Sequence, residues 1–114
     1  VALCPTGASH TWEGTNIVLV DADKCTGCKA CIAACPYDAR LVMHPEGYVD
    51  KCTFCHHRVA KGLDPACVSS CPTKCMYFGS LDDPGSEVSR LLRTRKHKVL
   101  NPGTGNEPNV YYLV

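Results

Sequence analysis

The sequence lacks long apolar runs and any large excess of one charge. No stretch approaches the roughly 18 apolar residues of a membrane-spanning helix, so no direct membrane span is predicted. The formal net charge of +1 provides no strong field for nucleic acid, and no nucleic-acid partner is predicted. The opening residues, VALCPTG, lack the basic and apolar regions of a signal peptide.

Aliphatic and aromatic side chains are also few, because the hydrophobic fraction of 45% includes ten cysteines in 114 residues. A cysteine share of about 9% is typical of small proteins held together by something other than apolar packing. Eight prolines and nine glycines predict many turns and short helices. We expect residues 1–80 to form a cofactor-binding domain and residues 81–114 to form a C-terminal helix and docking tail.

The cysteines are densest in the stretch KCTGCKACIAACP, residues 24–36. A disulfide scaffold fits poorly, because cysteines at every third residue are too close for ordinary bridges to distant partners. Zinc fits only the later group, Cys52-x2-Cys55 with Cys67-x3-Cys71, since one tetrahedral ion does not use three cysteines in register plus a fourth. An iron–sulfur cluster is the interpretation that suits the whole pattern.

The spacing C-x2-C-x2-C-x3-C-P is that of bacterial ferredoxins. Cys25, Cys28 and Cys31 would surround one [4Fe-4S] cubane, and Gly27 permits the tight turn between them. Cys35 follows a short helical turn and faces the other way. The pattern therefore predicts that Cys35 binds a neighbouring cluster.

Two segments repeat each other, DKCTGC at residues 23–28 and DKCTFC at residues 50–55. Each follows a short apolar stretch, and the dipeptide Cys-Pro occurs three times in the chain. We interpret the repeat unit as a cluster-binding loop, a short helix, Cys-Pro and a strand. In the second copy we predict a helix over residues 54–61 that ends at Gly62, then a short helix with Asp64-Pro65 as its cap and first residue.

The cluster of the first run needs a fourth thiolate, which should be the last cysteine of another Cys-Pro run. Cys4, in LCPTGAS, is such a cysteine, and a hairpin over residues 9–20 would bring it to the cluster. The predicted complete set is Cys4, Cys25, Cys28 and Cys31.

The remaining cysteines do not supply four ligands for each further cluster. Cys52, Cys55 and Cys67 would bind a second cluster. The fourth ligand of that cluster would lie outside this sequence. Cys35 and Cys71 would each bind a further cluster. This imbalance, with the absent initiator Met, indicates the C-terminal part of a longer polyferredoxin. The alternative is a free soluble two-cluster ferredoxin that carries electrons by diffusion, in which Cys35 or Cys71 closes the second site.

Several further residues allow two interpretations. Cys75 is a small buried hydrophobe by default, with a ligand role as the alternative. His56 and His57 are ordinary helix residues, with a histidine ligand as the alternative. Four lysines next to ligands either raise cluster potentials or are solvated and placed for docking: Lys24, Lys29, Lys51 and Lys74.

The tail predicts one longer helix over residues 83–98, capped by Asp83 and started by Pro84. Its apolar stripe is Val88, Leu91 and Leu92. Its basic face is either solvated or a docking face for a partner: Arg90, Arg93, Arg95, Lys96 and Lys98. Residues 109–114, NVYYLV, have the character of a strand.

The order of CPTGAS, DKCTGCKACIAACPYDAR and DKCTFCHHRVAKGLDPACVSSCPTKCMYFG resembles a known family, and so does the tail SLDDPGSEVSRLLRTRKHKVL. It is similar to the four-cluster electron-transfer subunit of molybdopterin oxidoreductases of the dimethyl sulfoxide reductase type. The tail resembles the versions found with tetrathionate, polysulfide or thiosulfate, and arsenate reductases. In that family the second and third cysteine groups share clusters. The resemblance makes Cys4 the end of the second group and Cys25 to Cys35 the third group. This agrees with Cys4 joining Cys25, Cys28 and Cys31 at one cluster. The first group and most of the second are absent here.

The resemblance implies an α+β, ferredoxin-like fold with short helices, small antiparallel strands and a C-terminal helix plus tail. It implies up to four [4Fe-4S] clusters in the full-length subunit, with a three-iron cluster left open at one of them. Such a subunit is not catalytic by itself. It relays electrons between a quinone-linked membrane subunit and a molybdopterin catalytic subunit in anaerobic respiration. The implied location is periplasmic, at the membrane through a partner, with the cytoplasm as the alternative.

Overall fold

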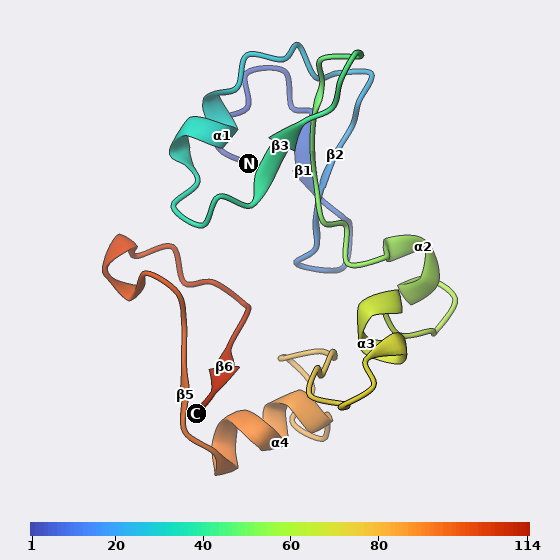
Figure 1. Cartoon of the computed structure of the whole chain (residues 1–114), viewed down its shortest axis with the longest axis vertical. Helices are drawn as coiled ribbons and strands as arrows, with labels where there is room; N and C mark the ends of the chain where they lie inside the picture. Colours follow the sequence, from blue (N-terminus) through green and yellow to red (C-terminus); the bar gives the residue numbers. More distant parts are fainter. The chain divides into compact units, whose positions relative to one another are not determined.

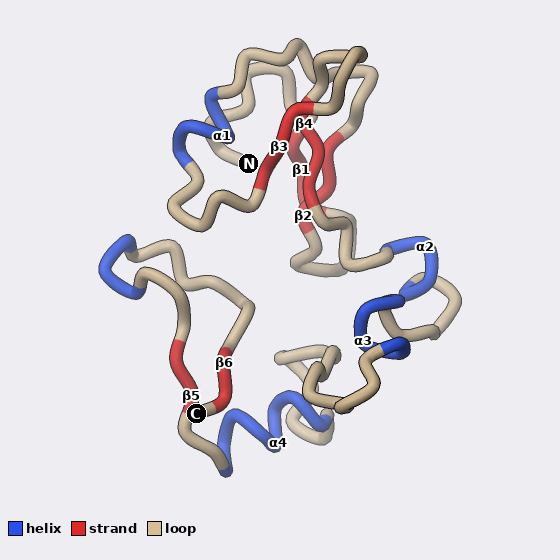
Figure 2. The backbone as a smooth tube through the Cα atoms, in the orientation of Figure 1, coloured by secondary structure: helices blue, strands red, loops and turns tan.

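The computed structural model describes all 114 residues and consists largely of loops (Figure 2). The chain divides into two compact units, Val1–His56 and His57–Val114. The predicted division into a cofactor-binding domain, residues 1–80, and a tail, residues 81–114, concerns function and stays a prediction. No helix is both long enough and apolar enough to cross a membrane.

The first unit contains two antiparallel hairpins and one short helix (Figure 1). Strand β1 (Ser9–Thr11) pairs with β2 (Val18–Val20), which confirms the hairpin expected over residues 9–20. Strand β3 (Arg40–Val42) pairs with β4 (Val49–Lys51), and β2 packs against β4. Few side chains are fully buried in this unit, and Ala8 and Val49 are each only 1% exposed.

Helix α1 (Ala30–Ala34) is short because both ends are constrained. Lys29 precedes it in the left-handed region, at φ 64°. Cys35 follows it in an extended conformation, with φ −74° and ψ 117°. A proline disfavours helical geometry in the residue before it, so Pro36 ends the helix at this point. The short helical turn before Cys35 is therefore confirmed.

The second repeat copy contains α2 (His56–Val59) and α3 (Ala66–Ser70). The predicted helix over residues 54–61 is wrong at both ends. Phe54 and Cys55 have φ of 56° and 51°, which a right-handed helix cannot include. Gly62 does adopt the predicted left-handed conformation, at φ 77°, and its amide donates to the Val59 carbonyl at 3.0 Å.

Helix α3 begins one residue later than predicted. Pro65 is the N-cap residue, and its carbonyl accepts hydrogen bonds from Val68 and Ser69 at 3.1 Å. Cys71 ends the helix with φ −66° and ψ 115°, close to the values of Cys35, because a proline follows it too. Residues 72–86 contain no strand, so the strand expected directly after Cys71-Pro72 is missing and the repeat unit is incomplete in its last copy.

Helix α4 (Glu87–Thr94) is shorter than the predicted helix over residues 83–98. Asp83 instead closes a turn, since its carboxylate accepts from the Gly85 amide at 2.9 Å and its carbonyl from the Ser86 amide at 3.1 Å. Ser86 is the cap, and its hydroxyl accepts from the Ser89 amide at 3.3 Å. Leu91 is buried, as its place in the apolar stripe predicts.

The chain ends in a third pair of strands. Strand β5 (His97–Lys98) pairs antiparallel with β6 (Tyr112–Leu113), and the 3₁₀ turn η1 (Pro102–Thr104) lies between them. The strand character predicted for residues 109–114 is confirmed in part, because only two of these residues form the strand.

Candidate metal centre

Four cysteines from two separate segments line one hollow in the first unit: Cys4, Cys25, Cys28 and Cys31. Cys35 belongs to the same sequence run but is not among the residues that line this hollow. This arrangement matches the predicted ligand set, in which the last cysteine of one Cys-Pro run joins three cysteines of another. The bonds of these thiols to iron stay a prediction.

Two backbone amides donate to the sulfurs of this hollow. The Ser9 amide lies 3.4 Å from Cys4 Sγ, and the Val49 amide lies 3.4 Å from Cys25 Sγ. Hydrogen bonds from the Ser9 amide and from Thr6 lower the pKa of the Cys4 thiol to about 7. The thiolate is the form that binds metal, so these donors favour the ligand state.

The turn of the first run depends on Gly27. Its φ is 76°, and a Cβ added there would lie 2.6 Å from the carbonyl oxygen of Gly47. Gly47 sits in the β3–β4 turn, where its amide donates to the Met43 carbonyl at 2.7 Å. The tight turn predicted at Gly27 therefore has a second cause, the close approach of another backbone segment.

Sequence reasoning missed Arg40, which lines the same hollow. Its Nη2 donates to the Ser9 hydroxyl at 2.8 Å. Arg40 stands directly opposite Lys51 in the β3–β4 register, so the hairpin places two cations side by side. The only sequence signal for Arg40 was a basic residue in the strand after the cysteine run at residues 25–35. Its place at the hollow depends on the pairing of β3 with β4, which the sequence does not give directly.

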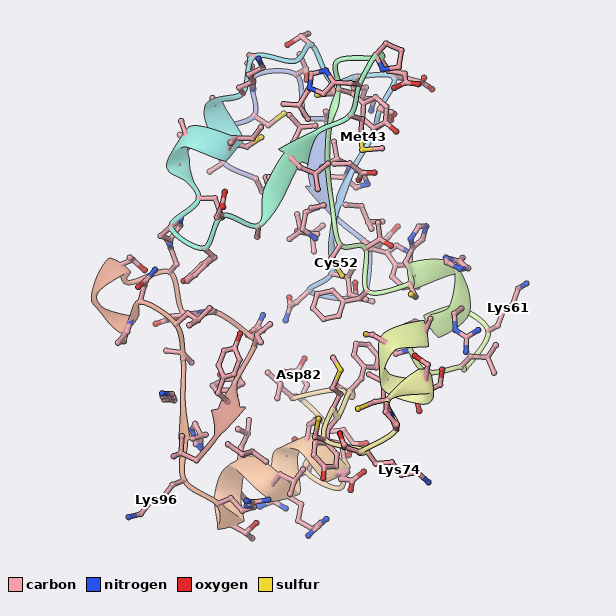
Figure 3. The ribbon with its side chains drawn as sticks, viewed as in Figure 1. Met43, Cys52, Lys61, Lys74, Asp82 and Lys96 are labelled. Atoms are coloured by element: carbon pink, nitrogen blue, oxygen red, sulfur yellow. The ribbon has the colours of Figure 1, made fainter.

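Lys51 is half-buried and hydrogen-bonded, unlike a fully solvated lysine. Its ammonium donates to the Val18 carbonyl at 2.7 Å and to the Cys52 carbonyl, and burial lowers the pKa of Lys51. Lys24, Lys29 and Lys74 are exposed, and Figure 3 shows Lys74 extending away from the backbone. The solvated interpretation suits these three residues better than Lys51.

The thiols of the second group differ in exposure. Cys52 and Cys67 are exposed, and Cys55 is half-buried. Cys52 Sγ accepts from the Phe54 amide at 3.5 Å, and Cys67 lies on α3. The assignment of Cys52, Cys55 and Cys67 to one cluster, and of Cys35 and Cys71 to others, stays a prediction.

Cys71 and Cys75 form a close pair, with their sulfurs 3.6 Å apart. The Thr73 hydroxyl lies 3.4 Å from Cys71 Sγ and donates to Cys75 Sγ at 3.2 Å. Hydrogen bonds from Thr73 and from Cys75 lower the pKa of the Cys71 thiol to about 6. Cys75 is exposed, so its interpretation as a buried hydrophobe is wrong.

None of the ten cysteines forms a disulfide, and no three side chains of cysteine, histidine or acidic residues converge at the distances of a single metal ion. A cubane needs no such convergence, because each thiolate bonds a different iron. His56 lies edge-on to Trp12, with ring centroids 6.0 Å apart. The four-thiol hollow with its amide donors therefore fits a [4Fe-4S] cluster better than a single ion.

Comparison with known proteins gives the same cofactor. A family model described as a 4Fe-4S dicluster domain matches residues 1–81. A tetrathionate reductase subunit of Salmonella typhimurium is 44% identical over 115 residues, which cover 99% of this chain and 46% of that protein. Protein NrfC of Escherichia coli K12 is 46% identical over 112 residues, 97% of this chain and 50% of NrfC.

A third relative is matched over more of its length. The arsenate respiratory reductase iron-sulfur subunit ArrB of Shewanella sp. strain ANA-3 is 32% identical over 161 aligned positions, which cover 99% of this chain and 68% of that subunit. The chain spans about half the length of the first two relatives.

Proposed function

The chain belongs to the 4Fe-4S dicluster domain family and carries [4Fe-4S] clusters, and on this premise we propose that it relays electrons inside a respiratory oxidoreductase. One observation carries the proposal: Cys4 and the three closely spaced thiols of the first run line one hollow, while Cys35 does not. In two-cluster ferredoxins the fourth cysteine of such a run ligates the neighbouring cluster, and this division of ligands sets two clusters side by side for electron transfer.

A bound [4Fe-4S] cluster supplies a one-electron redox centre. The chain's own residues hold and insulate it. The thiolates of Cys4, Cys25, Cys28 and Cys31 would bind it, and the amides of Ser9 and Val49 would donate to the ligand sulfurs. Buried Ala8 and Val49 line the same hollow and keep water away. Cys35, at the end of α1, would bind the next cluster along the relay.

A molybdopterin catalytic subunit is the proposed partner of this relay. The names of the relatives support it, because the tetrathionate reductase relative and the arsenate reductase relative are each named as a subunit of a larger enzyme. We further propose that a quinone-binding membrane subunit exchanges electrons at the other end. The chain itself would catalyse no bond chemistry.

Co-purification tests the relay against a free carrier. Affinity purification of the tagged native protein under anaerobic conditions should recover molybdenum and iron in one complex. Quinol analogues should then reduce its clusters when membranes are present. Recovery of a brown, molybdenum-free monomer would identify the free two-cluster ferredoxin instead.

We also propose a periplasmic location, held at the membrane through a partner. The resemblance of the tail to complexes exported in the folded state supports this. Osmotic-shock fractionation of the native host should release the protein, or leave it on the outer face of the inner membrane. Protection of the protein from protease in spheroplasts would place it in the cytoplasm.

A further inference from the structure

The guanidinium group of Arg40 is incompletely satisfied. Nη2 donates to the Ser9 hydroxyl at 2.8 Å, and Ser9 itself is only 4% exposed. Nη1 is buried, and no group of the chain accepts a hydrogen bond from it. A buried charged donor without an acceptor is costly, so such a group indicates an acceptor that the polypeptide does not supply.

The position of Arg40 identifies the acceptor. The residue lines the hollow formed by the four thiols of the first centre. It also stands opposite Lys51 in the β3–β4 ladder, where like charges oppose each other unfavourably. No carboxylate forms an ion pair with either cation. Four thiolates around an iron–sulfur core carry net negative charge, which would compensate the charge of Arg40.

The three cations at or near the hollow differ in what they face. Lys51 already donates to two backbone carbonyls, and it does not line the hollow. Lys29 lines the hollow but is exposed, so water and salt screen its charge. Only Arg40 combines a place at the hollow with a buried, unused donor.

We propose that Arg40 is the tuning residue of the centre held by Cys4, Cys25, Cys28 and Cys31. Its Nη1–H donates to a sulfur of this centre, and its permanent positive charge raises the reduction potential. Reduction adds one negative charge to the centre, and a nearby cation with a buried donor stabilises the more negative form. The inference rests on the proposed iron–sulfur centre and deepens it.

The test compares charge-removing variants in the intact, cluster-loaded protein. In Arg40→Gln, the ratio of reduced to oxidised centre at a fixed potential should fall about tenfold, which is a shift of about −59 mV for one electron. Arg40→Lys keeps the charge and should shift the ratio much less. The matched control is Lys24→Gln, because Lys24 adjoins Cys25 but is exposed and outside the hollow.

Potentials are read by electron paramagnetic resonance during redox titration, with iron content measured for each variant. A fully loaded Arg40→Gln protein with an unchanged potential would overturn the tuning role. An equal shift in Lys24→Gln would overturn it too, since removal of any nearby charge would then have the same effect.

A second measurement needs no variant. The wild-type protein labelled with ¹⁵N-arginine should show a weak ¹⁵N hyperfine coupling to the reduced centre. Its absence in a loaded protein would also overturn the inference. A wild-type protein without any cluster signal would instead refute the proposed function, so the two failures are distinguishable.

Discussion

Gly27 and Gly47 approach so closely that a Cβ at Gly27 would lie 2.6 Å from the Gly47 carbonyl oxygen. The contact joins the cysteine run to the β3–β4 turn, which carries no ligand. Both glycines also have positive φ, at 76° and 82°. The shape of the candidate centre is therefore fixed partly by backbone far away in the sequence.

Replacement of Gly27 should damage the centre more than backbone strain alone would. A left-handed Ala costs about 1–2 kcal/mol, and Gly27→Ala adds a clash with backbone that cannot move cheaply. We expect a large loss of iron per chain and a lower temperature at which the visible absorbance disappears.

The matched control is Gly14→Ala in the β1–β2 turn. Gly14 has φ 78°, and nothing lies within 4 Å of its added Cβ. This variant should suffer only the conformational cost and keep its iron. Equal iron loss in both variants would show that the contact with Gly47 is unimportant.

Cys75 should be the one reactive thiol that this chain presents in the loaded protein. It is exposed and lies outside the nine predicted ligands, although its sulfur is 3.6 Å from that of Cys71. Iodoacetamide under anaerobic conditions should alkylate Cys75 and spare the other nine until a chelator removes the iron. Peptide mapping by mass spectrometry gives the result. Protection of Cys75 that is lost with the iron would make it a ligand.

Ser86, and not Asp83, should control the start of α4. Loss of an N-cap hydroxyl costs about 1 kcal/mol, so Ser86→Ala should speed amide exchange at Ser89 and Arg90 about fivefold. Asp83→Ala removes only a turn contact to Gly85 and should leave that exchange nearly unchanged. Hydrogen–deuterium exchange measured by mass spectrometry distinguishes the two residues. A larger effect from Asp83→Ala would restore the predicted helix start.

Local rules predicted the parts of the fold that depend on neighbouring residues. The helices before Cys35 and Cys71 end where a proline follows, and Gly62 adopts the left-handed conformation that only a few residue types tolerate. The error at α4 is of the same local kind. Asp83 and Ser86 are both good capping residues, and sequence alone does not say which one the chain uses.

The site was predictable only where its residues follow a fixed spacing. The hollow contains the four thiols expected from the cysteine count. Arg40 could not be found in this way, because its place at the hollow depends on the β3–β4 register. The exposure of Cys75 could not be predicted either, because its sequence position after Cys71-Pro72 carries no information about burial.

The most direct test of the account is to compare three ligand variants of the intact protein, Cys4→Ser, Cys31→Ser and Cys35→Ser, by electron paramagnetic resonance of each resolved cluster. We predict that Cys4→Ser and Cys31→Ser alter one and the same cluster signal, whereas Cys35→Ser leaves that signal intact and alters another. An effect of Cys35→Ser on the cluster of Cys31, or effects of Cys4→Ser and Cys31→Ser on different clusters, would contradict the account.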